Sequence, residues 1–456
     1  MPAPTRLLAA AVTVAACLGA QALPAAAATG ATHPDASDAS DASDVSANEV
    51  SRGVTIPAFY DPPAELPATE GALIRSEPLP LALSLPTLHG PLPGTATRVM
   101  YRTTDSTGAP AAATGAYIEP SAKWRGAGPR PLVALAPGTQ GQGDQCAASL
   151  GLEHPIRLNG QTVSVGYEDL AIYRLLAKGV AVVVTDYIGL GATDRLHTYV
   201  NRLDEAHAVL DAVRATRSLR GASVTTESPV GLFGYSQGGG ATAAAAELQP
   251  TYAPDVRLSG TYAGAPPADL TETTRAIDGT DLVGALGWSL NGFLQSDPEL
   301  RPIADAHLND KGRAALEDLS TMCVGDAIIS YTSRKSSSWT TDGKSLEQII
   351  QAEPKLQEFL ARQRIGKLKP AGPVRVATGV ADNLVPHGQA RQLAVDWCGL
   401  GGQVSYKPVV LPDVGRALIN HFGPLLTDQG DAVNWLTDRL AGKPETNNCA
   451  SLPRLR

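Results

Sequence analysis

A glycine-flanked serine in the middle of the chain constrains the fold more than any other feature. The pattern G-x-S-x-G occurs at Gly234, Ser236 and Gly238, between an apolar run at residues 230–233 and an alanine-rich stretch at residues 241–248. This order predicts a strand, a sharp turn and a helix, which is the context of a nucleophile elbow. The glycines let the strand and the helix approach closely. We therefore expect Ser236 to be a nucleophile at a helix N-terminus, rather than a serine in an ordinary glycine-rich loop.

Short apolar runs and helical patterns alternate on both sides of this turn. Strands are expected at residues 96–104, 113–119, 132–136, 180–185, 230–233, 258–263, 374–380 and 404–411, and helices at 167–178, 205–219, 241–248 and 431–440. Residues 54–93 are rich in proline, and no regular element is expected there. Continuous apolar runs are typical of strands that are buried on both faces. The alternation predicts an α/β fold with a doubly wound, mostly parallel sheet.

The alternation stops at about residue 268 and resumes at about residue 371. Helical patterns at residues 282–294, 311–319 and 353–364 occupy the interval. We expect a helical cap at residues 268–370, inserted between two parts of the core at residues 56–267 and 371–456. The first of these helices is apolar on more than one face, so its side chains either form the core of the cap or line a pocket for an acyl chain.

The N-terminus has the pattern of an exported protein. In the expected signal peptide, residues 1–28, Arg6 precedes an apolar stretch and three alanines offer a cleavage site. The alternative is a lipoprotein anchored through Cys17, because residues 14–17 resemble a lipoprotein box. Residues 29–55 contain a repeated Asp-Ala-Ser pattern, which predicts an acidic, disordered linker. No later stretch resembles a membrane helix, so we expect a secreted protein.

Cysteine usage and charge limit the chemistry. Removal of Cys17 with the leader leaves Cys146, Cys323, Cys398 and Cys449 of the five cysteines. An even remainder in an exported chain favours disulfides, with three possible pairings. The formal charge of −8 argues against nucleic acid as a partner. No phosphate loop, dinucleotide motif or zinc-ligand spacing is present, so no cofactor or metal is expected. The oligomeric state stays open.

A serine nucleophile needs a base, and the base needs a carboxylate. Active sites of such sheets gather at the carboxyl ends of the strands, so both partners should follow late strands. Asp382 comes after the strand expected at residues 374–380, although an aspartate beside an asparagine commonly caps a turn. Asp413 is the competing acid, because it also follows a strand. His421 follows the last strand and is the expected base.

The tetrahedral intermediate of acyl transfer needs hydrogen-bond donors for its oxyanion. One donor is expected to be the backbone N–H of Gln237, the residue after the nucleophile. The other should come from the loop after residues 132–136, where Thr139 and Gln140 are the two candidates.

Several motifs follow one another in a fixed order. They are Gly138-Thr139-Gln140-Gly141, Asp144-Gln145-Cys146-Ala147, Asp186-Tyr187-Ile188-Gly189-Leu190-Gly191, His197-Thr198-Tyr199-Val200-Asn201-Arg202 and Gly234-Tyr235-Ser236-Gln237-Gly238-Gly239, followed by Asp382 and His421. Over about residues 56–445, this set resembles the secretory lipases of the α/β-hydrolase superfamily. The resemblance implies a triad of Ser236, Asp382 and His421, a helical cap and a buried acyl-binding tunnel. It also implies the disulfides Cys146–Cys323 and Cys398–Cys449. The acidic linker departs from the fungal members, and the cap differs most, so a chain-length preference does not carry over.

The expected function is therefore that of a secreted serine hydrolase. Its substrates would be lipids or other acyl esters, with a lipid–water interface as the expected place of action, and it would act through an acyl-enzyme. Acyl transfer and peptide hydrolysis are alternatives on the same fold. A non-catalytic binding module is the alternative of another class, but such a relative would be expected to lose the serine, the acid or the histidine, and all three are present.

Overall fold

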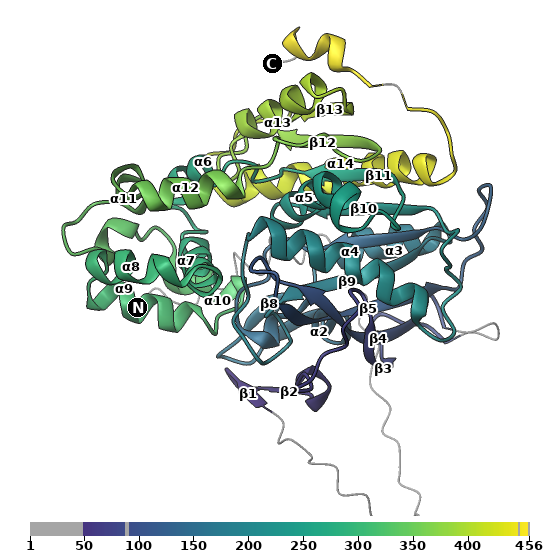
Figure 1. Cartoon of the computed structure of the whole chain (residues 1–456), viewed down its shortest axis with the longest axis horizontal. Coiled ribbons are helices and arrows are strands. Elements are labelled where there is room, and N and C mark those ends of the chain that lie inside the picture. The colour runs from purple at the N-terminus through teal and green to yellow at the C-terminus, as the bar shows by residue number, and fades with distance from the viewer. Residues whose placement is uncertain (1–48, 87–90, 446, 455–456) are drawn as a thin grey trace, which may run out of the picture. The chain divides into compact units, whose positions relative to one another are not determined.

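The computed structural model describes residues 49–86, 91–445 and 447–454 (Figure 1). The expected signal peptide, Cys17 and most of the expected linker lie outside the described residues. The end of that linker differs from the prediction, because β1 (Glu49–Ser51) and β2 (Val54–Ile56) form an antiparallel pair. Val54 and Ile56 are buried, and this local apolar alternation outweighs the acidic composition of the preceding residues. Within the described residues, no helix is long and apolar enough to cross a membrane.

A nine-stranded sheet is the centre of the described structure. Its strands, in spatial order, are β13 (Gln403–Val409), β12 (Pro373–Gly379), β11 (Leu258–Gly264), β10 (Val230–Tyr235), β6 (Leu132–Ala136), β9 (Ala181–Ile188), β5 (Pro110–Pro120), β4 (Gly94–Thr104) and β3 (Leu73–Leu79). The pairs from β13 to β9 are parallel, and those from β9 to β3 are antiparallel. The predicted doubly wound, mostly parallel sheet is therefore confirmed.

The edge strand β3 was not expected from the sequence. It lies in the proline-rich stretch for which no regular element is predicted, and it pairs with β4 from Leu73 to Leu79. Proline cannot donate to a neighbouring strand, but an edge strand needs only one neighbour. Pro78 is therefore tolerated within β3. The proline-rich composition of this stretch does not indicate that it pairs with β4.

Helices cover both faces of the sheet (Figure 1). One buried cluster joins the sheet to α4 (Arg202–Ser218), α5 (Gln237–Tyr252) and α13 (His387–Gly399). The cluster on the other face includes residues of α2 (Ala148–Glu153), α3 (Asp169–Ala177) and α14 (Ala417–Leu440). The core therefore has three layers, which is the usual solution for a parallel sheet that is apolar on both faces.

The chain between β11 and β12 forms the cap, with helices and no strand among these described residues. Its helices are α6 (Leu270–Ile277), α7 (Gly284–Ser296), α8 (Arg301–His307), α9 (Asp310–Leu319), α10 (Val324–Tyr331), α11 (Leu346–Ala352) and α12 (Pro354–Gln363). A separate buried cluster holds them together and includes Leu286, Trp288 and Phe293 of α7. These α7 side chains are thus packed in a buried cluster, which also contains Tyr199 and Leu384 from outside the cap.

Shorter elements complete the described structure. They are the antiparallel pair β7 (Ile156–Leu158) and β8 (Val163–Val165), and the 3-10 turns η1 (Ala58–Tyr60), η2 (Asp144–Cys146), η3 (Pro298–Leu300), η4 (Ser336–Trp339) and η5 (Cys449–Arg454).

The last helix begins earlier than expected. The sequence predicts a helix over residues 431–440, whereas α14 starts at Ala417 and contains Pro424. A proline interrupts a helix because it lacks an N–H and its ring clashes with the preceding turn. Here Pro424 packs against Gly379, where a Cβ would lie 2.4 Å from the proline Cγ. Tertiary packing therefore outweighs the local signal, and His421 lies in the first turns of a helix rather than in a loop.

Candidate active site

Ser236 lies at the sharp turn between β10 and α5. Its backbone has φ 58° and ψ −123°, a region that costs a non-glycine residue energy and is common at functional sites. A Cβ on Gly234 would lie 2.1 Å from the carbonyl oxygen of Gly238, and a Cβ on Gly238 would lie 2.0 Å from that of Ala136. The strand and the helix thus meet at a distance that only glycine permits, and this contact holds Ser236 at the helix N-terminus.

Asp382 and His421 form a buried pair. The Nδ1 atom of His421 lies 2.7 Å from Asp382 Oδ2, and the two side chains are 1% and 0% exposed. The other carboxylate oxygen, Oδ1, accepts hydrogen bonds from the backbone N–H groups of Leu384 and Val385, at 3.0 Å each. An ionised carboxylate can only accept, so Nδ1 carries the proton and Nε2 has a free lone pair.

The base candidate lies beside the elbow. The hydroxyl of Tyr235, next to Ser236, donates a 2.7 Å hydrogen bond to the carbonyl of His421, and the two rings are 5.3 Å apart. The Nε2 atom of His421 is buried and has no hydrogen-bond partner among the described residues. No hydrogen bond joins it to Ser236 Oγ in this part of the structure. The arrangement leaves an unpaired ring nitrogen on a histidine that contacts Tyr235, the residue before the elbow serine.

Asp413, the competing acid, and His387, another histidine close to Asp382 in the chain, have other contacts. Asp413 Oδ1 accepts hydrogen bonds from the N–H of Gly415 and from the side-chain amide of Asn420. It caps its own turn and is exposed. His387, which lies near Asp382 in sequence, bonds instead through Nε2 to the hydroxyl of Tyr406, at 3.0 Å. The structure therefore brings Asp382, and not Asp413, to His421.

The loop after β6 carries the second set of oxyanion candidates. Thr139 Oγ1 hydrogen-bonds to the hydroxyl of Tyr199, at 2.8 Å, and the amide of Gln140 donates to the carbonyl of Gly138, at 3.2 Å. Neither the backbone N–H of Thr139 nor that of Gln140 has an acceptor among the described residues. Both amides are therefore free to donate to a bound group.

A buried glutamate supports this loop and was not expected from the sequence. The backbone N–H of Gly138 donates a 2.7 Å hydrogen bond to Glu168 Oε1. Burial raises the pKa of Glu168 to about 7, because a carboxylate loses its hydration there. The hydroxyl of Tyr167 donates to the carbonyl of Thr139, at 2.9 Å. Nothing in the local sequence marks Glu168, since its partner lies 30 residues away.

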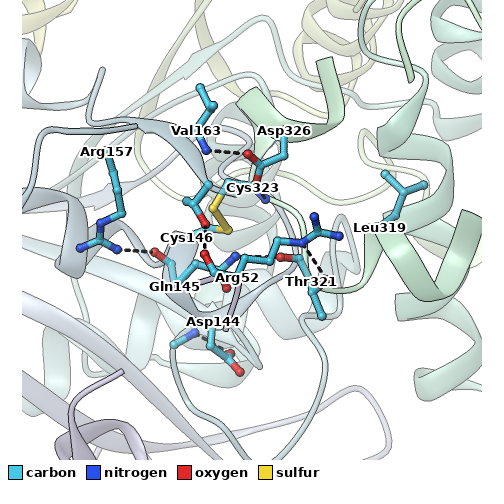
Figure 2. Close-up of a disulfide and its surroundings, with 12 residues drawn as sticks. Arg52, Asp144, Gln145, Cys146, Arg157, Val163, Leu319, Thr321, Cys323 and Asp326 are labelled. Atoms are coloured by element: carbon cyan, nitrogen blue, oxygen red, sulfur yellow. Dashed lines mark hydrogen bonds between the residues drawn. A yellow bond between two sulfur atoms is a disulfide. The ribbon is translucent and has the colours of Figure 1, made fainter. Parts of the chain in front are cut away.

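A disulfide joins the same loop to the cap. Cys146 is bonded to Cys323, and Figure 2 shows the bridge at the start of α10, beside the hydrogen bond from Val163 to Asp326. The N–H of Val324 donates to the carbonyl of Gln140, at 2.7 Å. The cap is thus fixed covalently and by hydrogen bonds to the loop that carries the oxyanion candidates.

The second bridge lies elsewhere in the fold. Cys398 of α13 is bonded to Cys449 of η5, so the C-terminal segment is attached to the last helix before β13. The structure therefore contains both of the disulfides that the resemblance implies. The described residues contain no cluster of three or more His, Cys, Asp or Glu side chains able to hold a metal ion.

Comparison of the structure with solved structures defines the fold. Candida antarctica lipase A in its closed state superposes with a TM-score of 0.70 at 20% identity, covering 85% of this chain and 87% of the other. The rice cell wall degrading esterase LipA from Xanthomonas oryzae has a TM-score of 0.66 at 22% identity, covering 82% and 100%. The fold is the α/β-hydrolase fold.

Sequence comparison defines the family. The model of the family described as "Secretory lipase" matches residues 152–448. A Mycobacterium tuberculosis protein named as a probable inactive lipase is 30% identical over 393 residues, which cover 86% of this chain and 83% of that protein. Lipase 10 of Candida albicans is 26% identical over 413 residues, which cover 87% and 84%. The chain belongs to the secretory lipase family.

Proposed function

We propose that this protein is a serine hydrolase that cleaves the carboxylic ester bonds of lipids or other acyl esters. The observation that carries the proposal is the buried Asp382–His421 pair, in which Nε2 is unpaired and the histidine contacts Tyr235, the residue before the elbow serine. A serine hydroxyl is a weak nucleophile until a base accepts its proton. This pair supplies a base with a defined tautomer.

In the proposed reaction, Ser236 Oγ attacks the ester carbonyl and His421 Nε2 accepts the hydroxyl proton. Asp382 stabilises the imidazolium that forms and holds the His421 ring in the orientation needed for proton transfer. The oxyanion accepts hydrogen bonds from the backbone N–H of Gln237 and from that of Thr139 or Gln140. His421 then donates its proton to the leaving alcohol, and water releases the acyl group by the same steps in reverse. Acyl transfer to an alcohol would use the same acyl-enzyme.

The relatives support an active enzyme to different degrees. One relative is named as a probable inactive lipase, whereas others are named as secreted triacylglycerol lipases. This chain has the serine, the acid and the histidine, and its acid and histidine are hydrogen-bonded. We therefore propose that it is catalytically active, and that it is exported, in agreement with the two disulfides.

The test combines covalent labelling with turnover. A fluorophosphonate probe should label the mature protein at Ser236, and p-nitrophenyl esters from acetate to palmitate should be hydrolysed. Ser236→Ala should abolish labelling and lower kcat by about 10⁴-fold or more. A folded wild-type protein that neither reacts with the probe nor cleaves any ester of the series would overturn the proposal.

A further inference from the structure

The side chain of Gln237 is held in a buried hydrogen-bond network behind the elbow. Its amide Nε2 donates to Glu205 Oε1, at 2.8 Å, and to His197 Nε2, at 2.9 Å. An amide nitrogen carries two hydrogens, so both are used. The residue is 2% exposed. The residue whose backbone N–H is the expected oxyanion donor is thus fixed through its side chain.

His197 is suited to accept this bond. Its Nδ1 lies 3.0 Å from the carbonyl oxygen of Ile188, and a carbonyl can only accept, so Nδ1 carries the proton. The Nε2 atom is therefore the acceptor for Gln237. Burial lowers the pKa of His197 to about 4, which keeps the ring neutral at neutral pH. The ring is stacked on Tyr187 with centroids 5.7 Å apart.

Glu205 accepts the hydrogen bond from the second hydrogen of the Gln237 side-chain amide. It lies in the first turn of α4, is 3% exposed, and its Oε1 also accepts the N–H of Val200, at 2.9 Å. Burial raises its pKa to about 8. At neutral pH the side chain is mostly protonated, so it places little negative charge near a developing oxyanion.

The same network reaches the other half of the expected oxyanion hole. Tyr199 lies edge-on to the ring of His197, at 5.9 Å, and its hydroxyl bonds to Thr139 Oγ1. The hydroxyl of Tyr187 donates to the carbonyl of Pro137, at 2.7 Å. His197 therefore lies between Gln237 on α5 and the loop after β6.

We propose that His197 and Glu205 are positioning residues, which hold the Gln237 side chain so that its backbone N–H points at the oxyanion. The inference rests on the proposed function, since it concerns the same transition state. An oxyanion donor acts at 2.7–3.1 Å from the developing charge, so a small displacement has a large effect on rate. Gln237 follows a strained residue, and its side-chain bonds resist relaxation of that turn.

The alternative is that this network only stabilises the fold. The two roles differ in what a substitution changes: a positioning role lowers kcat and the affinity for a transition-state analogue, whereas a structural role lowers the free energy of unfolding. The test therefore needs a variant that removes the acceptor and a variant that keeps it at the same position.

Glu205→Leu and His197→Phe remove the acceptors at similar volume, and Glu205→Gln keeps one. His207→Phe is the matched control, because His207 also lies on α4 and bonds to the carbonyl of Thr104 instead. Should Glu205→Leu fail to fold, Gln237→Met removes the same two bonds from the other side. Each variant is assayed with p-nitrophenyl butyrate and with a trifluoromethyl ketone, which forms a tetrahedral adduct with the serine.

We expect Glu205→Leu, His197→Phe and Gln237→Met to lose about 10- to 100-fold in kcat, less than the loss of a whole donor. The inhibition constant of the ketone should rise by a similar factor, with KM within about threefold and with Glu205→Gln recovering most of the rate. The inference is overturned if the folded variants lose no more kcat than His207→Phe, or if Glu205→Gln loses as much as Glu205→Leu. A fully active Ser236→Ala would instead refute the proposed function itself.

Discussion

The carboxylate of Asp382 has two roles at once, because Oδ2 binds His421 while Oδ1 caps the turn that follows β12. The sequence allowed a turn cap or an acid partner, and the structure shows that one does not exclude the other. The two backbone N–H groups fix the carboxylate, and the fixed carboxylate in turn orients the imidazole.

Asp382→Asn should inactivate the enzyme without unfolding it. An asparagine can keep the turn cap through its oxygen but presents an NH₂ group to Nδ1, which favours the wrong tautomer of His421. We expect kcat to fall by about 10³- to 10⁴-fold. Asp413→Asn is the matched control and should change kcat by less than about threefold, since the Asp413 side chain accepts hydrogen bonds from Gly415 and Asn420 and is not bonded to His421 among the described residues. An inactive Asp413→Asn beside a fully active Asp382→Asn would show that the acid is misassigned.

The two disulfides should differ in their effect on activity. Replacing Cys146 and Cys323 by serine frees the loop after β6 from the cap, so we expect kcat to decrease as well as stability. Replacing Cys398 and Cys449 should lower stability with little change in kcat, because that bridge holds the C-terminal segment. Either loss should cost about 2–5 kcal/mol of unfolding free energy. Urea unfolding and ester turnover separate the two effects; equal changes in kcat for both pairs would contradict the assignment.

Gly238→Ala should be among the most damaging single changes outside the proposed triad. The new Cβ would lie 2.0 Å from the carbonyl oxygen of Ala136, and a backbone atom on a central strand cannot move away cheaply. We expect loss of activity together with a large loss of stability. Gly388→Ala is the control, because nothing lies within 4 Å of its Cβ position in α13. It should be neutral or stabilise by up to about 1 kcal/mol. A stable, active Gly238→Ala protein would show that the elbow is less tightly packed than described.

Glu205→Gln should change how stability depends on pH. Burial raises the pKa of Glu205 from 4.5 to about 8, so between these values the folded protein holds a proton that the unfolded chain has lost. Rising pH in this window therefore destabilises wild type, by at most about 1.4 kcal/mol per pH unit. Glutamine cannot ionise, so the advantage of the variant should grow from about pH 4.5 and level off above about pH 8.

Urea unfolding of wild type and Glu205→Gln at several pH values measures this difference. The neighbouring Asp204, whose pKa is raised to about 6 by burial, titrates in the same window but is present in both proteins. Burial lowers the pKa of His197 from 6.5 to about 4, so His197 also makes stability depend on pH within this window, but it too is present in both proteins. A stability difference that does not change with pH would mean that Glu205 is ionised in the folded protein at neutral pH.

The elements that the sequence determined by itself are those whose signal is local. All five residues of β6 are apolar and buried, and α5 contains a run of buried alanines. In both elements the side-chain pattern along the sequence therefore predicts the burial. The turn at Ser236 is marked by its glycines for the same reason, since a close backbone contact excludes a Cβ. The doubly wound sheet, the helical interruption and the elbow could therefore be predicted from the chain alone.

Tertiary structure decided what depends on partners far apart in the chain. Asp382 and Asp413 both follow strands, and only packing brings one of them to His421, 39 residues away. No local sequence pattern identifies Glu205 and His197 as functional candidates. Their role depends on hydrogen bonds to Gln237, which only the folded chain brings within reach. β3 and the early start of α14 likewise contradict the local proline signal, because strand pairing and a contact with Gly379 compensate for it. A hydrogen bond is directional, so each donor needs an acceptor that the packed core places at the right distance and angle. The hydrophobic periodicity of the sequence does not say which residue will be that acceptor.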